Sequence, residues 1–241
     1  MKVDSADLVK LLEIQEMDNA IKAAKHKASV LPVHQTIGEL TRQRTQLLDD
    51  HIAAKTAVLD AGAAQQRAEA DVIPVKERLA RNQARVDAGE MDPKALSTAI
   101  EEIAHLKHRI AALEDAELEA MEASESANSH LAAVIEAVKA LESELREQVA
   151  ARDEAVAQLA QEAKQLGQAR AELGAQLPGA LMGLYEKIAG RSGGVGVAKL
   201  VGHRCAGCGL EATVADYNAY LAAPSDELIR CQECDRVLVR S

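Results

Sequence analysis

The chain has almost no aromatic side chains. Its 241 residues include no Phe, no Trp and only three Tyr, although 48% of them are hydrophobic. Aromatic side chains supply much of the buried area in ordinary globular cores, so this chain must bury mainly Ala, Leu, Val and Ile. These residue types are typical of helix-on-helix packing. The composition therefore argues against a conventional globular domain.

The sequence also lacks a long apolar stretch. No run of about 18 apolar residues occurs, and the N-terminus, MKVDSADLVK, has no apolar signal-peptide core. We therefore expect a cytoplasmic protein with no membrane contact. In that reducing compartment, the four cysteines are better interpreted as metal ligands than as two disulfides.

Two unlike parts can be distinguished along the chain. Residues 1–184 contain 21 Lys and Arg against 31 Asp and Glu, whereas residues 185–241 contain seven of each. All the tyrosines and cysteines lie in the second part. We predict a helical coiled-coil hairpin over 1–184 and a four-cysteine zinc ribbon domain over 185–241. The acidic first part should repel nucleic acid.

A seven-residue apolar repeat dominates the first part. It runs from Leu131 through Val138 and Leu145 to Leu173, and an earlier repeat includes Ile103 and Ile110. Apolar residues at this spacing are typical of the core seam of a coiled coil. Because the apolar pattern fades between Met121 and Asn128, we expect a shift of register there.

The second helix of this coiled coil is expected within the same chain. Gly89 breaks the helical pattern, and Asp92-Pro93 provides an N-cap followed by proline at the first helical position. A turn near 87–93 would place residues 33–86 antiparallel against 93–150. Pro32 should end a separate helix over 5–29, which we expect to pack near 150–175, and Pro74 should kink the first arm. The apolar pattern is then explained by internal packing, with an exposed partner-binding stripe as the alternative.

Two Cys-x-x-Cys pairs, Cys205 with Cys208 and Cys231 with Cys234, are 22 residues apart. Each pair can direct both thiolates at one centre, and two pairs complete a tetrahedral shell for one structural Zn²⁺. A thioredoxin-like redox pair is disfavoured because no alternating strand and helix pattern surrounds it. Iron–sulfur ligation stays open. Four thiolates leave no open position for catalysis at the metal.

The rest of the tail has strand and helix signals. We expect short strands at 195–201, 228–230 and 237–239, and one helix over 213–221. Tyr217 and Tyr220 could stack on bases, but covering the metal site is the simpler role. The glycines at 193–196 lack the Lys-Ser/Thr of a phosphate loop and predict a flexible joint. His203 is expected to face solvent, since four cysteines already fill the shell.

Several segments resemble a known bacterial family. They are Leu113 to Glu122, Tyr185 to Ile188, Arg191 to Val195 and the two cysteine pairs. The chain resembles the CT398-like family, in which a coiled-coil hairpin precedes a C4-type zinc ribbon. This resemblance implies nucleic-acid binding, including RNA, and partners in flagellar or secretion-related gene expression. The Ala-rich composition suggests an actinobacterial member.

Two functional hypotheses follow, and in neither is the protein an enzyme or a binder of small molecules. In the first, the chain is an adaptor that binds RNA, or else DNA, through the ribbon. In the second, it is a scaffold that binds protein partners on the acidic coiled coil. No catalytic constellation stands out from the solvated helix faces. The candidate phosphate contacts of the first hypothesis are Lys187, Arg191, Lys199, Arg204, Arg230, Arg236 and Arg240.

Overall fold

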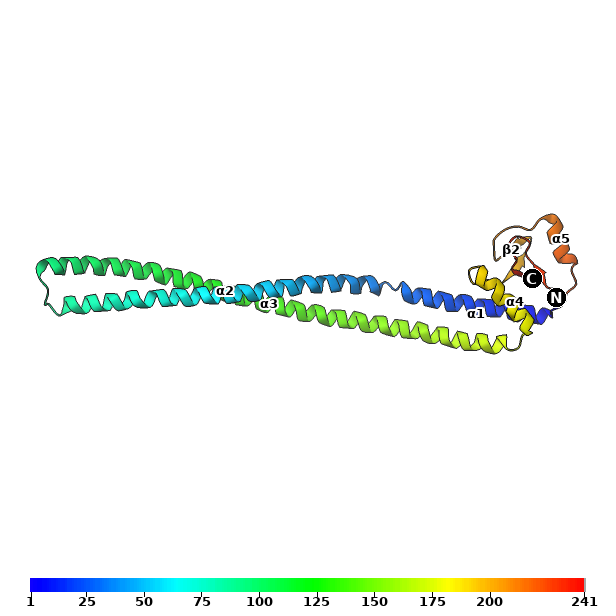
Figure 1. Cartoon of the computed structure of the whole chain (residues 1–241), viewed down its shortest axis with the longest axis horizontal. Coiled ribbons are helices and arrows are strands. Elements are labelled where there is room, and N and C mark those ends of the chain that lie inside the picture. The colour runs from blue at the N-terminus through cyan, green and yellow to red at the C-terminus, as the bar shows by residue number, and fades with distance from the viewer. Residues whose placement is uncertain (241) are drawn as a thin grey trace. The chain divides into compact units, whose positions relative to one another are not determined.

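A computed structural model describes residues 1–240. Figure 1 shows long helices followed by a small region of strands, so the predicted fold class is confirmed. The helices are α1 (Ser5–Ser29), α2 (Val33–Asp87), α3 (Pro93–Gly174), α4 (Gly179–Arg191) and α5 (Val214–Ala222). The strands are β1 (Val197–Val201), β2 (Arg204–Cys205), β3 (Ile229–Arg230) and β4 (Val237–Arg240).

The chain divides into two compact units. The hairpin unit spans Gln35–Val149, and the terminal unit combines Met1–His34 with the segment that begins at Ala150. The boundary expected between residues 184 and 185 stays a prediction. No helix among residues 1–240 is both long and apolar enough to span a membrane.

In the hairpin unit, α2 and α3 run antiparallel and are joined by the predicted turn. Gly89 has a positive φ of 69°, and the Asp92 carboxylate accepts hydrogen bonds from the first amides of α3. Ion pairs link the helices at Arg44 with Glu142 (2.9 Å) and at Lys76 with Glu114 (2.6 Å). These contacts confirm a hairpin in which residues 44–76 lie opposite residues 114–142.

The expected shift of register in the middle of α3 is wrong. Buried and half-buried residues follow a seven-residue step from Ile103 and Ile110 to Leu131 without interruption. The two intervening positions are Glu117 and Ser124, which are polar but still point inward. The apolar pattern fades there because small and polar residues occupy the seam. The helix itself keeps its phase.

One buried polar group of the hairpin has no partner. The side-chain Nδ2 of Asn82 makes no hydrogen bond within the described chain, and only 9% of the residue is exposed. An unsatisfied buried amide costs about 1–3 kcal/mol. Polar residues in a coiled-coil seam persist because they fix register, at a cost in stability.

We therefore expect Asn82→Leu to stabilise the hairpin unit by about 1 kcal/mol, because it removes the desolvated amide. Thermal unfolding followed by far-UV circular dichroism measures this. The control is Asn128→Leu, since Asn128 is exposed and already donates to the Ser124 carbonyl. A lower unfolding temperature for Asn82→Leu than for the wild type would contradict the expectation.

The terminal unit contains a four-stranded sheet with the order β2-β1-β4-β3. β1 pairs with β4 in parallel, whereas the two outer pairs are antiparallel. Successive side chains of β1 and β4 alternate between two buried clusters. Val197 and Val237 join a cluster with α1 and α4, while Ala198 and Leu238 join a second cluster around the cysteines.

Helix α1 is an integral part of this unit. Asp4 caps its first turn, the helix ends before Pro32 as predicted, and Leu11 and Ile14 are fully buried. The helix packs against β1 and β4. It also reaches α3, because the Asp18 carboxylate accepts a hydrogen bond from Arg170 (3.1 Å). The predicted packing of this helix near residues 150–175 is confirmed. Its packing on the strands β1 and β4 was not predicted from the sequence.

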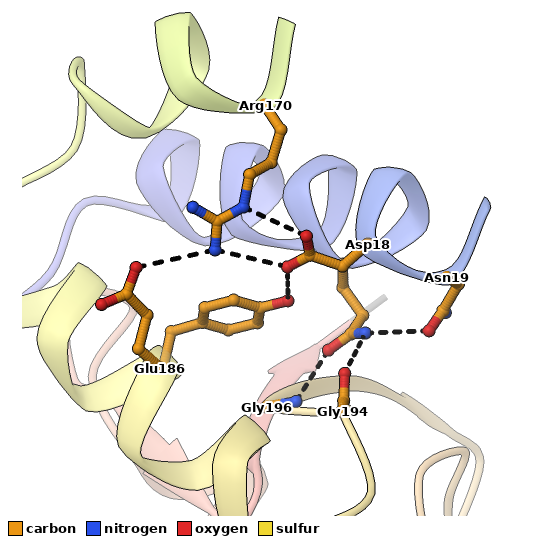
Figure 2. Close-up of polar contacts among 8 residues, drawn as sticks. Asp18, Asn19, Arg170, Glu186, Gly194 and Gly196 are labelled. Atoms are coloured by element: carbon orange, nitrogen blue, oxygen red, sulfur yellow. Dashed lines mark hydrogen bonds and ion pairs between the residues drawn. The ribbon is translucent and has the colours of Figure 1, made fainter. Parts of the chain in front are cut away.

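The glycine segment 193–196 is held by α1 rather than free (Figure 2). The buried Gln15 side chain donates to the Gly194 carbonyl (2.9 Å) and accepts from the Gly196 amide (2.7 Å). Lys22 donates to the Gly193 carbonyl (2.9 Å). The predicted flexible joint is therefore an anchored loop.

Candidate metal centre

The two cysteine pairs occupy turns of the same geometry. In the first turn the Cys205 amide donates to the Leu210 carbonyl, and the Gly209 amide donates back to the Cys205 carbonyl. In the second turn Cys231 makes the matching pair of bonds with Arg236 and Asp235. The residue after each second cysteine has a positive φ, 76° at Gly209 and 63° at Asp235. The chain thus presents two copies of one metal-binding turn.

The four sulfur atoms gather at one point. All lie within 4.8 Å of one another, with 3.9 Å between the Sγ atoms of Cys205 and Cys234 and 4.0 Å between those of Cys208 and Cys231. A tetrahedral ion with metal–sulfur bonds of about 2.3 Å separates its ligand atoms by about 3.8 Å. A disulfide would need about 2.05 Å. The cluster is therefore suited to hold one metal ion.

Without a metal ion the thiols are unequal. Burial raises the pKa of Cys205, and it raises the pKa of Cys231 to about 12. For Cys234 burial acts in the same direction, but hydrogen bonds from the backbone and side chain of Arg236 lower its pKa to about 7. Cys234 is therefore the most readily ionised of these three thiols, and a cation would favour the thiolate at all four positions.

Asp235 connects the second turn to the rest of the terminal unit. It is the only residue other than glycine with a positive φ among those described. Its carboxylate pairs with both Arg191, at the end of α4, and Arg230, in β3. A glycine would relieve the backbone but would remove both ion pairs, which explains the choice of Asp here.

Two further predicted phosphate contacts are used inside the unit. Arg236 donates to the carbonyls of Val195 and Ser192, at 3.0 and 2.9 Å. Arg240 donates to the carbonyls of Tyr220, Ala223 and Pro224, all within 3.1 Å. Both guanidinium groups therefore tie loops together.

The remaining three candidate cations are more exposed. The Lys199 Nζ lies 3.7 Å from a carboxylate oxygen of Glu16, and an Arg204 guanidinium nitrogen lies 2.9 Å from a carboxylate oxygen of Glu211. Both ion pairs are at the surface. Lys187 is exposed on α4. Exposed pairs of this kind contribute little to stability and exchange readily with other partners.

The tyrosines near the cysteines cover the site as predicted. Tyr220 is buried, and its hydroxyl accepts a hydrogen bond from the Gln232 amide between the second pair of cysteines. Tyr217 packs against the same cluster, with its ring centroid 3.9 Å from that of the exposed His203.

No local sequence pattern predicts the side-chain contacts that link α1 to α4. The Tyr185 hydroxyl donates to Asp18 (2.7 Å), and Arg170 contacts both Asp18 and Glu186 (Figure 2). Burial and this hydrogen bond raise the pKa of Tyr185. Asp18 is 167 residues from Tyr185 and 152 residues from Arg170 along the chain, so no local motif could reveal the network.

Comparison with known proteins agrees with this arrangement. Residues 14–193 match the profile of the CT398-like coiled-coil hairpin domain, which covers most of the chain. The chain belongs to the CT398-like coiled-coil hairpin family. The predicted resemblance is confirmed.

Mycobacterial proteins are among the relatives of this CT398-like chain. It is 32% identical to an uncharacterised Mycobacterium tuberculosis protein over 240 residues, covering 100% of this chain and 98% of the relative. A solved Mycobacterium smegmatis structure is 30% identical, with a TM-score of 0.82 and full coverage of both chains. CT398 of Chlamydia trachomatis shares the fold at 15% identity, with a TM-score of 0.63 and 98% coverage of each chain.

Proposed function

We propose that this CT398-like protein is a non-enzymatic scaffold, in which one structural zinc ion stabilises the terminal unit and the acidic hairpin unit binds a protein partner. Zinc suits the metal centre because four soft thiolates in tetrahedral spacing are its usual structural shell. A multi-iron cluster is larger than one ion and fits the close sulfur spacing less well. A closed shell also leaves no position at which the metal could activate water.

The engagement of the arginines supports a protein partner over a nucleic acid. Arg191, Arg230, Arg236 and Arg240 already contact a carboxylate or backbone carbonyls of the terminal unit. Of the seven candidates, Lys187, Lys199 and Arg204 remain for phosphates, and the last two would first have to leave the exposed carboxylates of Glu16 and Glu211. Affinity for nucleic acid grows with the number of neutralised phosphates, so three cations support weak binding.

The charge of the hairpin unit points the same way. Residues 35–149 contain 22 Asp and Glu against 13 Lys and Arg. A surface of this sign repels a polyanion and attracts cationic surfaces of proteins. The hypothesis of RNA or DNA binding through the ribbon stays a prediction, and the scaffold is the better supported of the two.

We test the two hypotheses side by side on the full-length chain. After cross-linking in extract of the source organism, we expect peptides of one partner protein to be attached within residues 35–149. Filter binding of total RNA should be weak and should change little in the triple variant Lys187→Ala/Lys199→Ala/Arg204→Ala. Strong RNA binding that falls by orders of magnitude between about 50 and 200 mM salt and is lost in this variant would favour the nucleic-acid hypothesis instead.

A further inference from the structure

One side of the hairpin unit exposes large aliphatic side chains. Their exposure ranges from 44% for Met121 to 67% for Leu59. Monomeric proteins rarely leave such side chains grouped at the surface unless they meet a partner. We call this group the apolar flank, and it consists of Ile52, Leu59 and Ile73 on α2 with Leu118 and Met121 on α3.

The members of the apolar flank lie on the same side of the two helices. Each of them directly follows an inward-pointing position of the seven-residue repeat. Lys76 and Glu114 also directly follow such positions, and their side chains meet across the two helices at 2.6 Å. In an antiparallel pair, the positions that follow the inward ones share one side. The five side chains therefore lie on the same side of the α2–α3 pair.

Packing within the hairpin does not account for this surface. Between Leu59 and Ile73 most inward positions are small or polar, namely Ala61, Gln65 and Ala68 on α2 and Glu117, Ala120 and Ser124 on α3, whereas Val58 and Val72 point inward at the two ends of this stretch. Within this stretch large aliphatic residues thus lie outside, while most inward residues are small or polar. This is the reverse of the pattern that a self-sufficient hairpin needs.

A glycine leaves room in the middle of the apolar flank. Gly62 follows the inward Ala61 within α2, and a Cβ placed there would meet no atom within 4 Å. Glycine weakens a helix, and no neighbour within the hairpin requires its small size. The space above Gly62 can accept a side chain from another helix, in the way that small residues admit knobs in helix packing.

The surroundings of the apolar flank are strongly acidic. Residues 49–71 and 114–136, which lie opposite each other, contain twelve Asp and Glu against two Lys and Arg. Their net charge of −10 equals the formal net charge of the whole chain. A second copy of the chain would bring the same charge and be repelled, whereas a cationic helix would be attracted.

We propose that the apolar flank binds a cationic amphipathic helix of a partner protein, which packs along α2 and α3 as a third helix. This inference rests on the proposed scaffold function and specifies its partner. The apolar face of the incoming helix would cover the five aliphatic side chains, and its Lys and Arg residues would face the surrounding carboxylates.

The test uses the full-length chain and a fluorescein-labelled 21-residue peptide, with Leu at the inward positions of a heptad and Lys elsewhere. Fluorescence anisotropy gives the dissociation constant. We expect Leu118→Ser/Met121→Ser to weaken binding at least tenfold, because two apolar side chains are no longer covered. The matched control is Val214→Ser/Leu221→Ser, which changes two exposed apolar residues of α5 and should leave binding unchanged. Far-UV circular dichroism verifies that both variants keep their helices.

Three outcomes would overturn the inference: the Leu118/Met121 variant binds like the wild type, a scrambled peptide of the same composition binds as tightly, or sedimentation shows a dimer that this variant dissociates. The last result would assign the flank to a second copy. Failure of the scaffold itself is recognised separately, because cross-linked partner peptides would then be absent from residues 35–149. Partner cross-links confined to other sides of the hairpin would leave the scaffold intact and reject the flank.

Discussion

Cys205→Ser should abolish metal binding and unfold the part of the terminal unit around the cysteines, while the long helices remain. The cluster that would lose its metal contains Cys205, Tyr220 and Cys231, and it has few large side chains. A domain of this size depends on its metal, since structural zinc contributes on the order of 10 kcal/mol to folding. The helices α1 to α4 do not share this dependence, because their buried residues lie mainly outside that cluster.

Two optical signals separate these effects. All three tyrosines lie in the terminal unit, and Tyr217 and Tyr220 belong to the cysteine cluster, so near-UV circular dichroism reports on the metal side. The far-UV helical signal comes almost entirely from α1 to α4, since α5 has only nine residues. We expect loss of the tyrosine signal and of bound zinc by elemental analysis, with most of the helical signal retained.

The control for this variant is Ala206→Ser, which places the same hydroxyl in the same turn at an exposed position. It should keep its zinc and its tyrosine signal. Loss of most helical signal in Cys205→Ser would show that the metal centre supports the long helices too, contrary to the expectation.

The sequence predicted the features that depend on local patterns. The heptad step, the turn at Gly89 and Asp92 and the two cysteine turns each need only residue types at a fixed spacing. Dependence on residue type also explains why the expected shift of register in α3 is wrong. Glu117 and Ser124 interrupt the apolar pattern, but they occupy inward positions of the same seven-residue repeat.

Individual side-chain contacts between distant segments could not be predicted, apart from the meeting of the two cysteine pairs. The sequence pattern around Gln15 is typical of an ordinary polar residue on a surface helix. In the structure Gln15 is buried and forms hydrogen bonds with the backbone of Gly194 and Gly196. The sequence alone predicts that Arg236 and Arg240 are available for phosphates. In the structure both donate hydrogen bonds to backbone carbonyls that only the folded chain brings near them. Side-chain function at such positions depends on tertiary packing, which a single sequence does not encode as a motif.

Gly196→Ala is expected to destabilise the terminal unit by about 3 kcal/mol, at the upper end of overpacking effects. Gly196 is buried where β1 approaches α4, and an added Cβ would lie 2.6 Å from the Tyr185 ring and 2.7 Å from the Tyr185 carbonyl oxygen. The ring can turn aside, but the carbonyl belongs to the helix backbone and cannot. Relief would require α4 and β1 to separate, which would also weaken the hydrogen bond from the Gly196 amide to Gln15.

The matched control is Gly183→Ala in α4, where an added Cβ meets nothing within 4 Å. Alanine favours a helix interior over glycine by up to about 1 kcal/mol, so this variant should be neutral or more stable. Denaturant unfolding followed by tyrosine fluorescence compares the two, because every tyrosine of the chain reports on the terminal unit. Since Gly196 approaches Tyr185, a member of the cluster shared with α1, and not the cysteines, its variant should retain zinc under native conditions. An unfolding midpoint equal to that of the wild type would mean that α1, α4 and β1 pack more loosely around Gly196 than their contacts indicate.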